Sequence, residues 1–155
     1  MTKKKQRLLC LALFSVLVFV HFLFDAMCKI MVADEEKTLI RGFVTLHYLR
    51  NTGAAFGLLS TDPLLVDCLS GIFLITLTAW MLFGNMCTAA RLSLSTVLAG
   101  GACNLYMRLV HGGVNDWIDL IFMRFPLFNF ADICVCLGAL LFLAFHLFVK
   151  GQQKQ

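Results

Sequence analysis

The feature that most constrains this chain is a set of four long runs that contain no charged residue. These runs are Leu8–Phe24, Cys68–Ala90, Leu92–Met107 and Ile133–Val149, with 17, 23, 16 and 17 residues. A helix needs about 17 to 25 apolar residues to cross a bilayer, and Arg or Lys side chains at its ends can reach the interface and extend a short run. The runs therefore predict four membrane-spanning helices, at about 8–28, 65–87, 91–110 and 131–149.

The composition also favours a membrane protein. Hydrophobic residues make up 60% of the 155 residues and charged residues only 14%, against about 45–50% and about 25% in soluble domains. A chain this short could not bury so much apolar surface in its own core. Because the sequence has no internal repeat or linker, we expect one integral-membrane domain over residues 1–155. The net charge of +4 is too small to indicate a nucleic-acid partner.

Basic residues indicate how the helices are oriented. The amino tail and the segment after the last run carry Lys3, Lys4, Lys5, Arg7, Lys150 and Lys154. An even number of spans puts both tails on one side, which the positive-inside bias makes cytoplasmic. The longer connections, at about 30–64 and 111–130, then face outward. These connections or their edges hold every Asp and Glu except Asp25.

Three segments need a closer interpretation. The basic start and first run are typical of a signal peptide, but no A-x-A-like site follows and three more runs do, so we expect an uncleaved span. The third run is short and contains Gly100 and Gly101, which predicts a helix packed against others rather than facing lipid. Between the first and second spans, β-favouring residues 43–48 and turn residues 51–57 predict a small extracytoplasmic sheet. The predicted fold class is therefore an all-α membrane protein with four spans and this sheet.

The seven cysteines and four histidines do not form a recognisable chemical site. The cysteines lie mostly inside the predicted spans, and Cys134 and Cys136 lack the C-x-x-C spacing of a redox pair. We interpret them as buried, inert thiols. The sequence contains neither H-E-x-x-H nor G-x-S-x-G. We therefore expect no metal, no cofactor and no serine nucleophile.

Carboxylates remain as candidates for chemistry. Asp116 follows the third run and Asp132 opens the fourth, so both should lie near the outer membrane surface, at facing ends of two helices. Two carboxylates brought together share one proton, so that one acts as base and the other as acid. Such a pair activates water for attack on an amide. The alternative is that Asp132 only favours a helix start and Asp116 is a loop residue. Asp119 rivals Asp116 on these grounds.

Other polar residues could support such a site. Asp25 and Lys29 are four residues apart on the first span and can pair with each other. Asn104 and Arg108 have the same spacing on the third span. Asn51 and Asn129 each adjoin a turn or a helix start, where local capping is the simpler interpretation. Together these residues could line a polar, outward-opening cavity.

At this point the sequence resembles a known family, the lipoprotein signal peptidases (signal peptidase II), which are bacterial membrane aspartyl peptidases. Asn51–Gly57 is similar to the family's N-x-G-A-A-F-G box, Arg108–Asp116 to its R-L-x-x-G-x-V-x-D box and Phe128–Asp132 to F-N-x-A-D, each complete. Asp25–Lys29 resembles D-x-x-[ST]-K, with Cys28 replacing the hydroxyl residue. The boxes stand in the family's order over nearly the whole chain.

One further box departs from the pattern. Aligned on Asn104 and Arg108, the family's G-G-A-x-G-N-x-x-D-R falls on residues 99–108 without a gap. The departures at 99, 101 and 103 exchange one small residue for another. Met107 stands where the family has Asp, so the group that balances Arg108 must lie elsewhere.

The resemblance implies an aspartic endopeptidase that removes the signal peptide of a prolipoprotein just before its diacylglyceryl-modified cysteine. It places the catalytic carboxylates on Asp116 and Asp132 and so favours Asp116 over Asp119. Site-supporting or substrate-binding roles fall to Asn51, Gly53, Asn104, Arg108, Asn129, Asp25 and Lys29. The expected partners are prolipoproteins and membrane lipid, and the chain itself is expected to be a monomer. The expected location is the bacterial cytoplasmic (inner) membrane, with the active site near its outer face.

Two alternatives belong to other classes of protein. A small non-enzymatic transporter subunit could use Asp25, Lys29 and the aspartates as an ion path, although paired half-repeats with broken helices are absent. A family member could also bind precursors without cutting them. Met107 favours that second alternative, and the presence of both aspartates opposes it.

Overall fold

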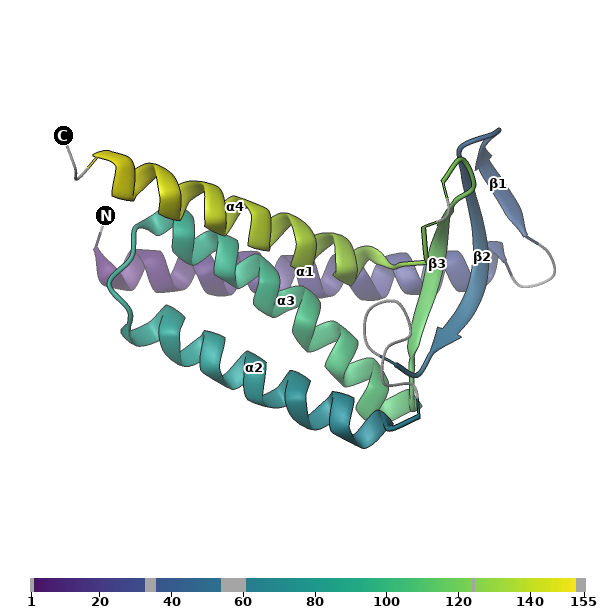
Figure 1. Cartoon of the computed structure of the whole chain (residues 1–155), viewed down its shortest axis with the longest axis horizontal. Coiled ribbons are helices and arrows are strands. Elements are labelled where there is room, and N and C mark those ends of the chain that lie inside the picture. The colour runs from purple at the N-terminus through teal and green to yellow at the C-terminus, as the bar shows by residue number, and fades with distance from the viewer. Residues whose placement is uncertain (1, 33–35, 54–60, 124, 153–155) are drawn as a thin grey trace.

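Four helices and a three-stranded sheet make up the protein in the computed structural model, which describes residues 2–32, 36–53, 61–123 and 125–152, with 147–152 by their backbone alone. The elements in chain order are α1 (Lys3–Met31), β1 (Lys37–Ile40), β2 (Val44–Asn51), α2 (Pro63–Phe83), α3 (Thr88–His111), β3 (Val114–Leu120) and α4 (Phe130–Gln152). The helices lie side by side, and the sheet covers one end of them (Figure 1). At the other end α1 begins and α4 ends.

The helices are close to the predicted spans, with one difference. The predicted second span continues to residue 87, whereas α2 ends at Phe83. Gly84 there adopts an extended backbone and its N–H donates to the Trp80 carbonyl, while Cys87 caps the start of α3. The uncharged run continues through this turn, so charge alone could not mark it. Among the described residues, α1 and α2 are long and apolar enough to cross a membrane, and Phe130–His146 forms a shorter apolar helix.

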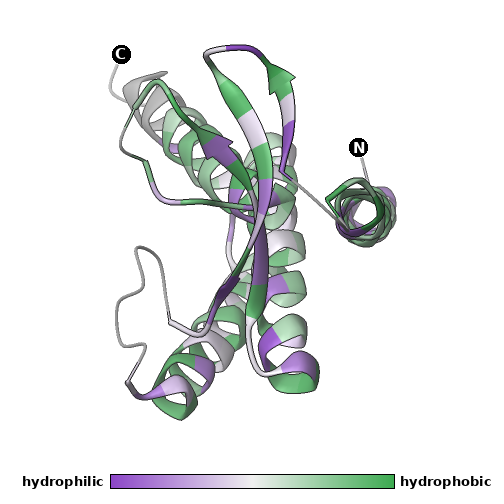
Figure 2. Cartoon of the chain, turned by 90° about the vertical axis from the view of Figure 1, so that its right-hand side faces the viewer, coloured by the Kyte–Doolittle hydropathy of each residue, from purple (hydrophilic) through white to green (hydrophobic). Residues whose placement is uncertain are grey.

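The helix α3 is the centre of the bundle, as the short third run with its two glycines predicts. It packs against α1, α2 and α4 and buries residues along its whole length. A side chain at Gly100 would collide with the Ala131 carbonyl of α4, and one at Gly101 with Leu74 of α2. These two glycines therefore allow α3 to approach a different helix on each side. Large apolar side chains cover the outer surfaces of the bundle, and Figure 2 shows the helices mostly hydrophobic and the sheet more mixed.

The sheet draws on both outer connections. Its order is β1-β2-β3, and both pairings are antiparallel. The sequence predicts a sheet between the first two helices only, but β3 comes from the connection between α3 and α4. The strand was missed because Val114–Leu120 contains Asn115, Asp116 and Asp119, which are poor strand formers. Its pairing with β2 compensates for them.

A small core attaches the sheet to the end of α1. Cys28 of α1, Leu46 of β2 and Trp117 of β3 pack together, each buried. Cys28 therefore serves as a small apolar residue between the helix and the sheet, where the resembling motif has a hydroxyl. This contact fixes the strand that carries Asp116 relative to the helices.

Candidate active site

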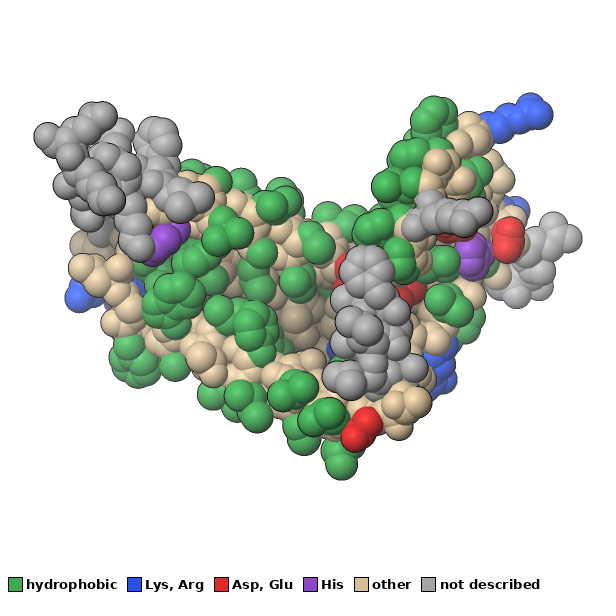
Figure 3. Space-filling view, viewed as in Figure 1, with side chains coloured by type: hydrophobic (Ala, Val, Ile, Leu, Met, Phe, Trp, Pro, Cys, Tyr) green, Lys and Arg blue, Asp and Glu red, His purple; other side chains and the backbone are tan. Residues whose placement is uncertain are grey.

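A connected set of five polar side chains lies where the sheet meets α3 and α4, and we call it the carboxylate network. Its members are Asn51, Asn104, Asp116, Asn129 and Asp132. The surface is hollowed where the helices meet the sheet, and acidic side chains lie at that hollow (Figure 3). The structure thus brings together two aspartates that are 16 residues apart in the sequence.

Asp132 is held by the start of α4. Asn129, the residue before α4, and Asp132 bond reciprocally: the Asn129 N–H donates to Asp132 Oδ2 at 3.0 Å, and the Asp132 N–H donates to Asn129 Oδ1 at 3.1 Å. This is the geometry of a capping box, which satisfies two backbone N–H groups that a helix start leaves free. Asn104 of α3 donates to the other oxygen, Asp132 Oδ1, at 2.7 Å. The helix-start interpretation of Asp132 is therefore right, but it describes only part of its contacts.

Asp116 is held by two asparagines from different elements. Asn129 Nδ2 donates to Asp116 Oδ1 at 2.9 Å, and Asn51 Nδ2 donates to Asp116 Oδ2 at 3.2 Å. Asp116 is only 2% exposed. It lies on β3 rather than at a helix end, which differs from the prediction of two facing helix ends.

Asn129 joins the two carboxylates. Its Nδ2 donates to Asp116 and also to Asn104 Oδ1, at 3.2 Å, while its Oδ1 and its backbone N–H bond to Asp132. Every polar atom of this side chain is used, and the residue is 1% exposed. Local capping, the simpler interpretation from the sequence, thus accounts for one half of its role. The other half needs the fold.

The electrostatics of Asp116 are those of a carboxyl group that retains its proton unusually well. The pKa of Asp116 is raised from 3.8 to about 6, first by burial and second by the negative charge of Asp132. The hydrogen bonds from Asn129 and Asn51 and the charge of Arg108 act in the opposite direction. Desolvation and a second carboxylate are the two causes expected of a pair that shares a proton. Asp116 is therefore partly protonated near pH 6.

Asp25 contacts this site through β3 and not through Lys29. Asp25 Oδ1 accepts hydrogen bonds from Asn115 Nδ2 at 3.2 Å and from the Trp117 indole at 2.8 Å. These donors flank Asp116 on both sides. The expected pairing of Asp25 with Lys29 is wrong, because an indole and an amide 90 or more residues away satisfy the carboxylate; Lys29 is exposed. In the part of the chain that the structure describes, His47 Nδ1 and Asp119 Oδ2 are the only basic and acidic side-chain atoms within 4 Å of each other, at 3.7 Å.

The contact with His47 also shows that Asp119 and Asp116 have different surroundings. Asp119 is opposite Thr45 in the sheet and close to His47. No hydrogen bond among the described residues joins Asp119 to the carboxylate network. Of the two rival aspartates, the structure brings Asp116 to Asp132.

Arg108 and Gly53 lie beside the carboxylate network. Arg108 Nη2 donates to the Gly53 carbonyl at 2.9 Å, and the Gly53 N–H donates to Asn51 Oδ1 at 3.0 Å. These bonds connect α3 to the segment that follows β2. The rest of the resembling box, residues 54–57, lies outside the described residues.

The carboxylate with the largest electrostatic effect on Arg108 belongs to a residue that sequence reasoning missed. Met107, where the resembling pattern has Asp, is buried and apolar. The carboxylates that act most on Arg108 are Asp67 first, then Asp132 and Asp116. Asp67 lies in the first turns of α2, with Oδ1 buried and without a hydrogen-bond partner among the described residues. No motif marks Asp67, so only the packing of α2 on α3 reveals it.

Within the described residues, no three His, Cys, Asp or Glu side chains gather in a way that could hold a metal ion. The carboxylate network instead offers two carboxyl groups, one of them buried, surrounded by amide donors. Such an arrangement can take a proton from water and give one to a reacting group.

Comparison with known proteins points in the same direction. The family model described as signal peptidase (SPase) II matches residues 17–148. A lipoprotein signal peptidase from Clostridium acetobutylicum is 32% identical over 148 residues, covering 90% of this chain and 96% of the relative. One from Syntrophus aciditrophicus is 35% identical over 160 residues, covering 93% and 97%. A solved structure described as a bacterial membrane enzyme superposes with a TM-score of 0.79 at 26% identity, covering 94% of this chain and 91% of the other.

Proposed function

Because this chain belongs to the signal peptidase II family of bacterial membrane proteases, we propose that it cuts prolipoproteins by aspartic chemistry, just before a diacylglyceryl-modified cysteine. Membership supports the removal of signal peptides from prolipoproteins as the reaction, and it leaves no support for the ion-path alternative. The observation that carries the aspartic mechanism is the link from Asp116 to Asp132 through Asn129.

The mechanism uses the two carboxyl groups as base and acid. The ionised carboxylate takes a proton from a water molecule, whose oxygen attacks the scissile carbonyl carbon. The protonated carboxyl donates to the substrate, and the C–N bond then breaks to leave a carboxylic acid and the amine of the lipidated cysteine. General acid and base catalysis contributes about 10²- to 10⁴-fold to such reactions. No covalent intermediate is needed.

We assign the shared proton to Asp116 and the activation of water to Asp132. Asp116 is the more buried member, and its pKa is raised to about 6. Asp132 is partly exposed, so water can reach it. This assignment predicts that kcat/KM falls as pH rises above the pKa of Asp116 in the free enzyme. A profile that instead falls only on the acidic side of pH 6 would give Asp116 the role of base.

We further propose that all four helices cross the membrane, with both tails cytoplasmic, the carboxylate network near the outer face and the chain monomeric. The supporting observations are that α1 begins and α4 ends opposite the sheet (Figure 1), and that the basic tail of α1 lies at that end. A substrate with a signal helix and acyl chains would then arrive through the lipid, beside the hollow at the sheet.

The test is a cleavage assay with purified enzyme and a diacylglyceryl-modified precursor. Asp116→Asn and Asp132→Asn should each lower kcat by 10²-fold or more while the protein still inserts and purifies as a folded monomer. Asp119→Asn is the matched control on the same strand and should cleave at nearly the original rate. Near-normal cleavage by either of the first two variants would refute the aspartate pair.

A second measurement separates the lipid requirement from the chemistry. The same precursor without its diacylglyceryl group should be cleaved far more slowly, and mass spectrometry should place the cut immediately before the modified cysteine. Equal cleavage of both precursors would remove lipid recognition from the proposal and leave the aspartate pair intact.

A further inference from the structure

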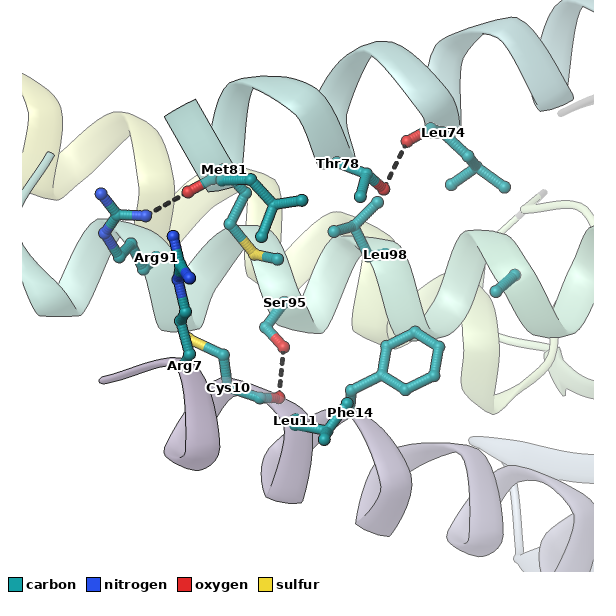
Figure 4. Close-up of a pocket in the computed structure, with 12 residues that line it drawn as sticks. Arg7, Cys10, Leu11, Phe14, Leu74, Thr78, Met81, Arg91, Ser95 and Leu98 are labelled. Carbon is teal, nitrogen blue, oxygen red and sulfur yellow. Dashed lines mark hydrogen bonds between the residues drawn. The ribbon is translucent and has the colours of Figure 1, made fainter. Parts of the chain in front are cut away.

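A cavity of about 450 Å³ lies between α1 and α2, away from the carboxylate network. Both helices pack on α3, which contributes Ser95 and Leu98 to the floor of the cavity (Figure 4). The cavity is partly open to the outside. Its walls are almost entirely apolar side chains. The Ser95 hydroxyl on the floor donates to the Cys10 carbonyl of α1 at 2.7 Å, so it is already satisfied. The volume is within the range of about 300–1,000 Å³ that is typical of ligand sites.

The two ends of this lateral cavity differ in charge. Figure 4 shows Arg7 of α1 and Arg91 of α3 at one end, and Phe14 and Leu74 toward the other. A smaller, more polar cavity of about 220 Å³ adjoins the arginine end and shares both arginines, with Lys3 in its wall as well. Neither cavity has an Asp or Glu among its lining residues. The combined space is thus apolar at one end and cationic at the other.

The two arginines are in different situations. Arg91 donates to the carbonyls of Met81 and Gly84 at the end of α2, and its Nε is buried without a hydrogen-bond partner among the described residues. Arg7 is exposed and has no hydrogen-bond or ion-pair partner within the part of the chain that is described. Two like charges placed together repel each other, and an anion between them would relieve that repulsion.

We propose that the lateral cavity binds one anionic phospholipid from the leaflet beside the basic tail of α1. One acyl chain occupies the apolar end, and the phosphate lies at Arg7 and Arg91. A signal peptide is the other long apolar molecule that could occupy the cavity, but the charge of the cavity argues against it. In the membrane orientation proposed above, the basic region of a signal peptide lies at the same end as the arginines, so Arg7 and Arg91 would repel it. An anionic headgroup fits both the charge and the open side.

The test is lipid retention by the purified full-length enzyme, measured by native mass spectrometry with phosphatidylglycerol and, separately, with phosphatidylcholine. The native enzyme should retain phosphatidylglycerol preferentially. Arg7→Gln should weaken that retention about fivefold, which is what one basic residue contributes at an anionic lipid surface. Arg41→Gln, an exposed basic residue in the turn between β1 and β2, is the matched control and should have no effect.

A second variant tests the apolar end. Ala102→Leu adds a larger side chain to the floor of the cavity and should weaken retention of both lipids. Equal retention of the two lipids by the native enzyme, an equal loss from Arg41→Gln, or unchanged retention by Ala102→Leu would each overturn the proposal. Displacement of phosphatidylglycerol by a synthetic signal peptide would also overturn it, because the cavity would then hold substrate. Arg7→Gln should still cleave precursor at the native rate, because Arg7 is not part of the carboxylate network. Lipid retention and cleavage therefore test the two proposals separately.

Discussion

The two ends of the helical bundle satisfy their polar side chains in different ways. At the sheet end, polar side chains bond mainly to one another, as in the chain from Asn51 through Asp116 and Asn129 to Asp132. In the rest of the bundle, hydroxyl and guanidinium groups donate mainly to backbone carbonyls. Examples are Thr76, Thr78, Ser93, Ser95, Thr96 and Arg91.

The difference shows where chemistry is possible. A hydroxyl that donates to a backbone carbonyl of its own helix is satisfied by local geometry, and no proton there has a second place to go. In the carboxylate network, each carboxylate accepts hydrogen bonds from neutral amide groups, including at least one side chain of another element, so it can gain or lose a proton without breaking a helix. Under the proposed mechanism, polar groups are therefore fixed to the backbone in most of the bundle and exchange protons at the sheet end.

The largest expected effect concerns the pH dependence of stability. The pKa of Asp116 is about 6 when folded against 3.8 as its ordinary value, so the folded state binds the proton more tightly. Protonated Asp116 therefore contributes to the free energy of unfolding. This contribution is fully present below about pH 4 and is lost as pH rises through about 6. Its full size is about 3 kcal/mol. Thermal unfolding in detergent should show a fall in Tm over this range.

The control for this effect is Asp116→Asn, which cannot titrate. Its Tm should lack the pH-dependent component that the native enzyme shows between pH 4 and 7. Identical pH dependence in the two proteins would show that burial of Asp116 does not cost stability. The electrostatic difference between the sheet end and the rest of the bundle would then not be supported.

The next effect comes from breaking the link between the carboxylates. Asn129→Ala removes the donors to Asp116 and Asn104 and the cap of α4. A buried hydrogen bond to a charged group contributes about 1.5–3 kcal/mol, so kcat should fall about 10- to 100-fold. Asn129→Ser keeps a capping hydroxyl but cannot bridge the two carboxylates. If Ser restored the rate, capping alone would explain the role of Asn129.

A smaller effect should follow from the charge near Arg108. Asp67→Asn removes the carboxylate that acts most on this arginine, and kcat/KM should fall about fivefold, or on the order of 1 kcal/mol. Asp62→Asn is the matched control, because it removes a nearby charge while Asn still caps α2. An equal loss in both variants would show a general effect of charge and no specific role for Asp67.

The smallest effect on cleavage is expected in the helical part. Ser95→Ala removes the bond to the Cys10 carbonyl and should lower the free energy of unfolding by about 1 kcal/mol. Cleavage should be unchanged, because Ser95 bonds only to the backbone. Circular dichroism melting and the precursor assay together check both statements. A large loss of activity would contradict the division of the molecule into two ends.

The sequence was most informative where local patterns decide the structure. Uncharged runs locate the helices, and Gly100 and Gly101 indicate that α3 packs internally, because both depend on neighbouring residues alone. The sequence was not sufficient where the structure depends on a residue that is distant along the chain. Asp25 bonds to Trp117 and Asn115 rather than to Lys29, β3 forms only because β2 is beside it, and Asp67 has no motif. The role of Asn129 lies between these cases, since its capping is local and its link to Asp116 is not.

The way in which the carboxylate network is assembled has a consequence for biosynthesis. Its members come from β2, α3, β3, the residue before α4 and the first turn of α4, and Asp25 of α1 accepts a hydrogen bond from Trp117 of β3. A ribosome makes these elements in order, so a chain that has not yet produced α4 has only one of the two carboxylates. If the pair is the catalyst, a half-made enzyme cannot cut other proteins at the translocation site. Proteolysis then begins only after the last helix has been inserted.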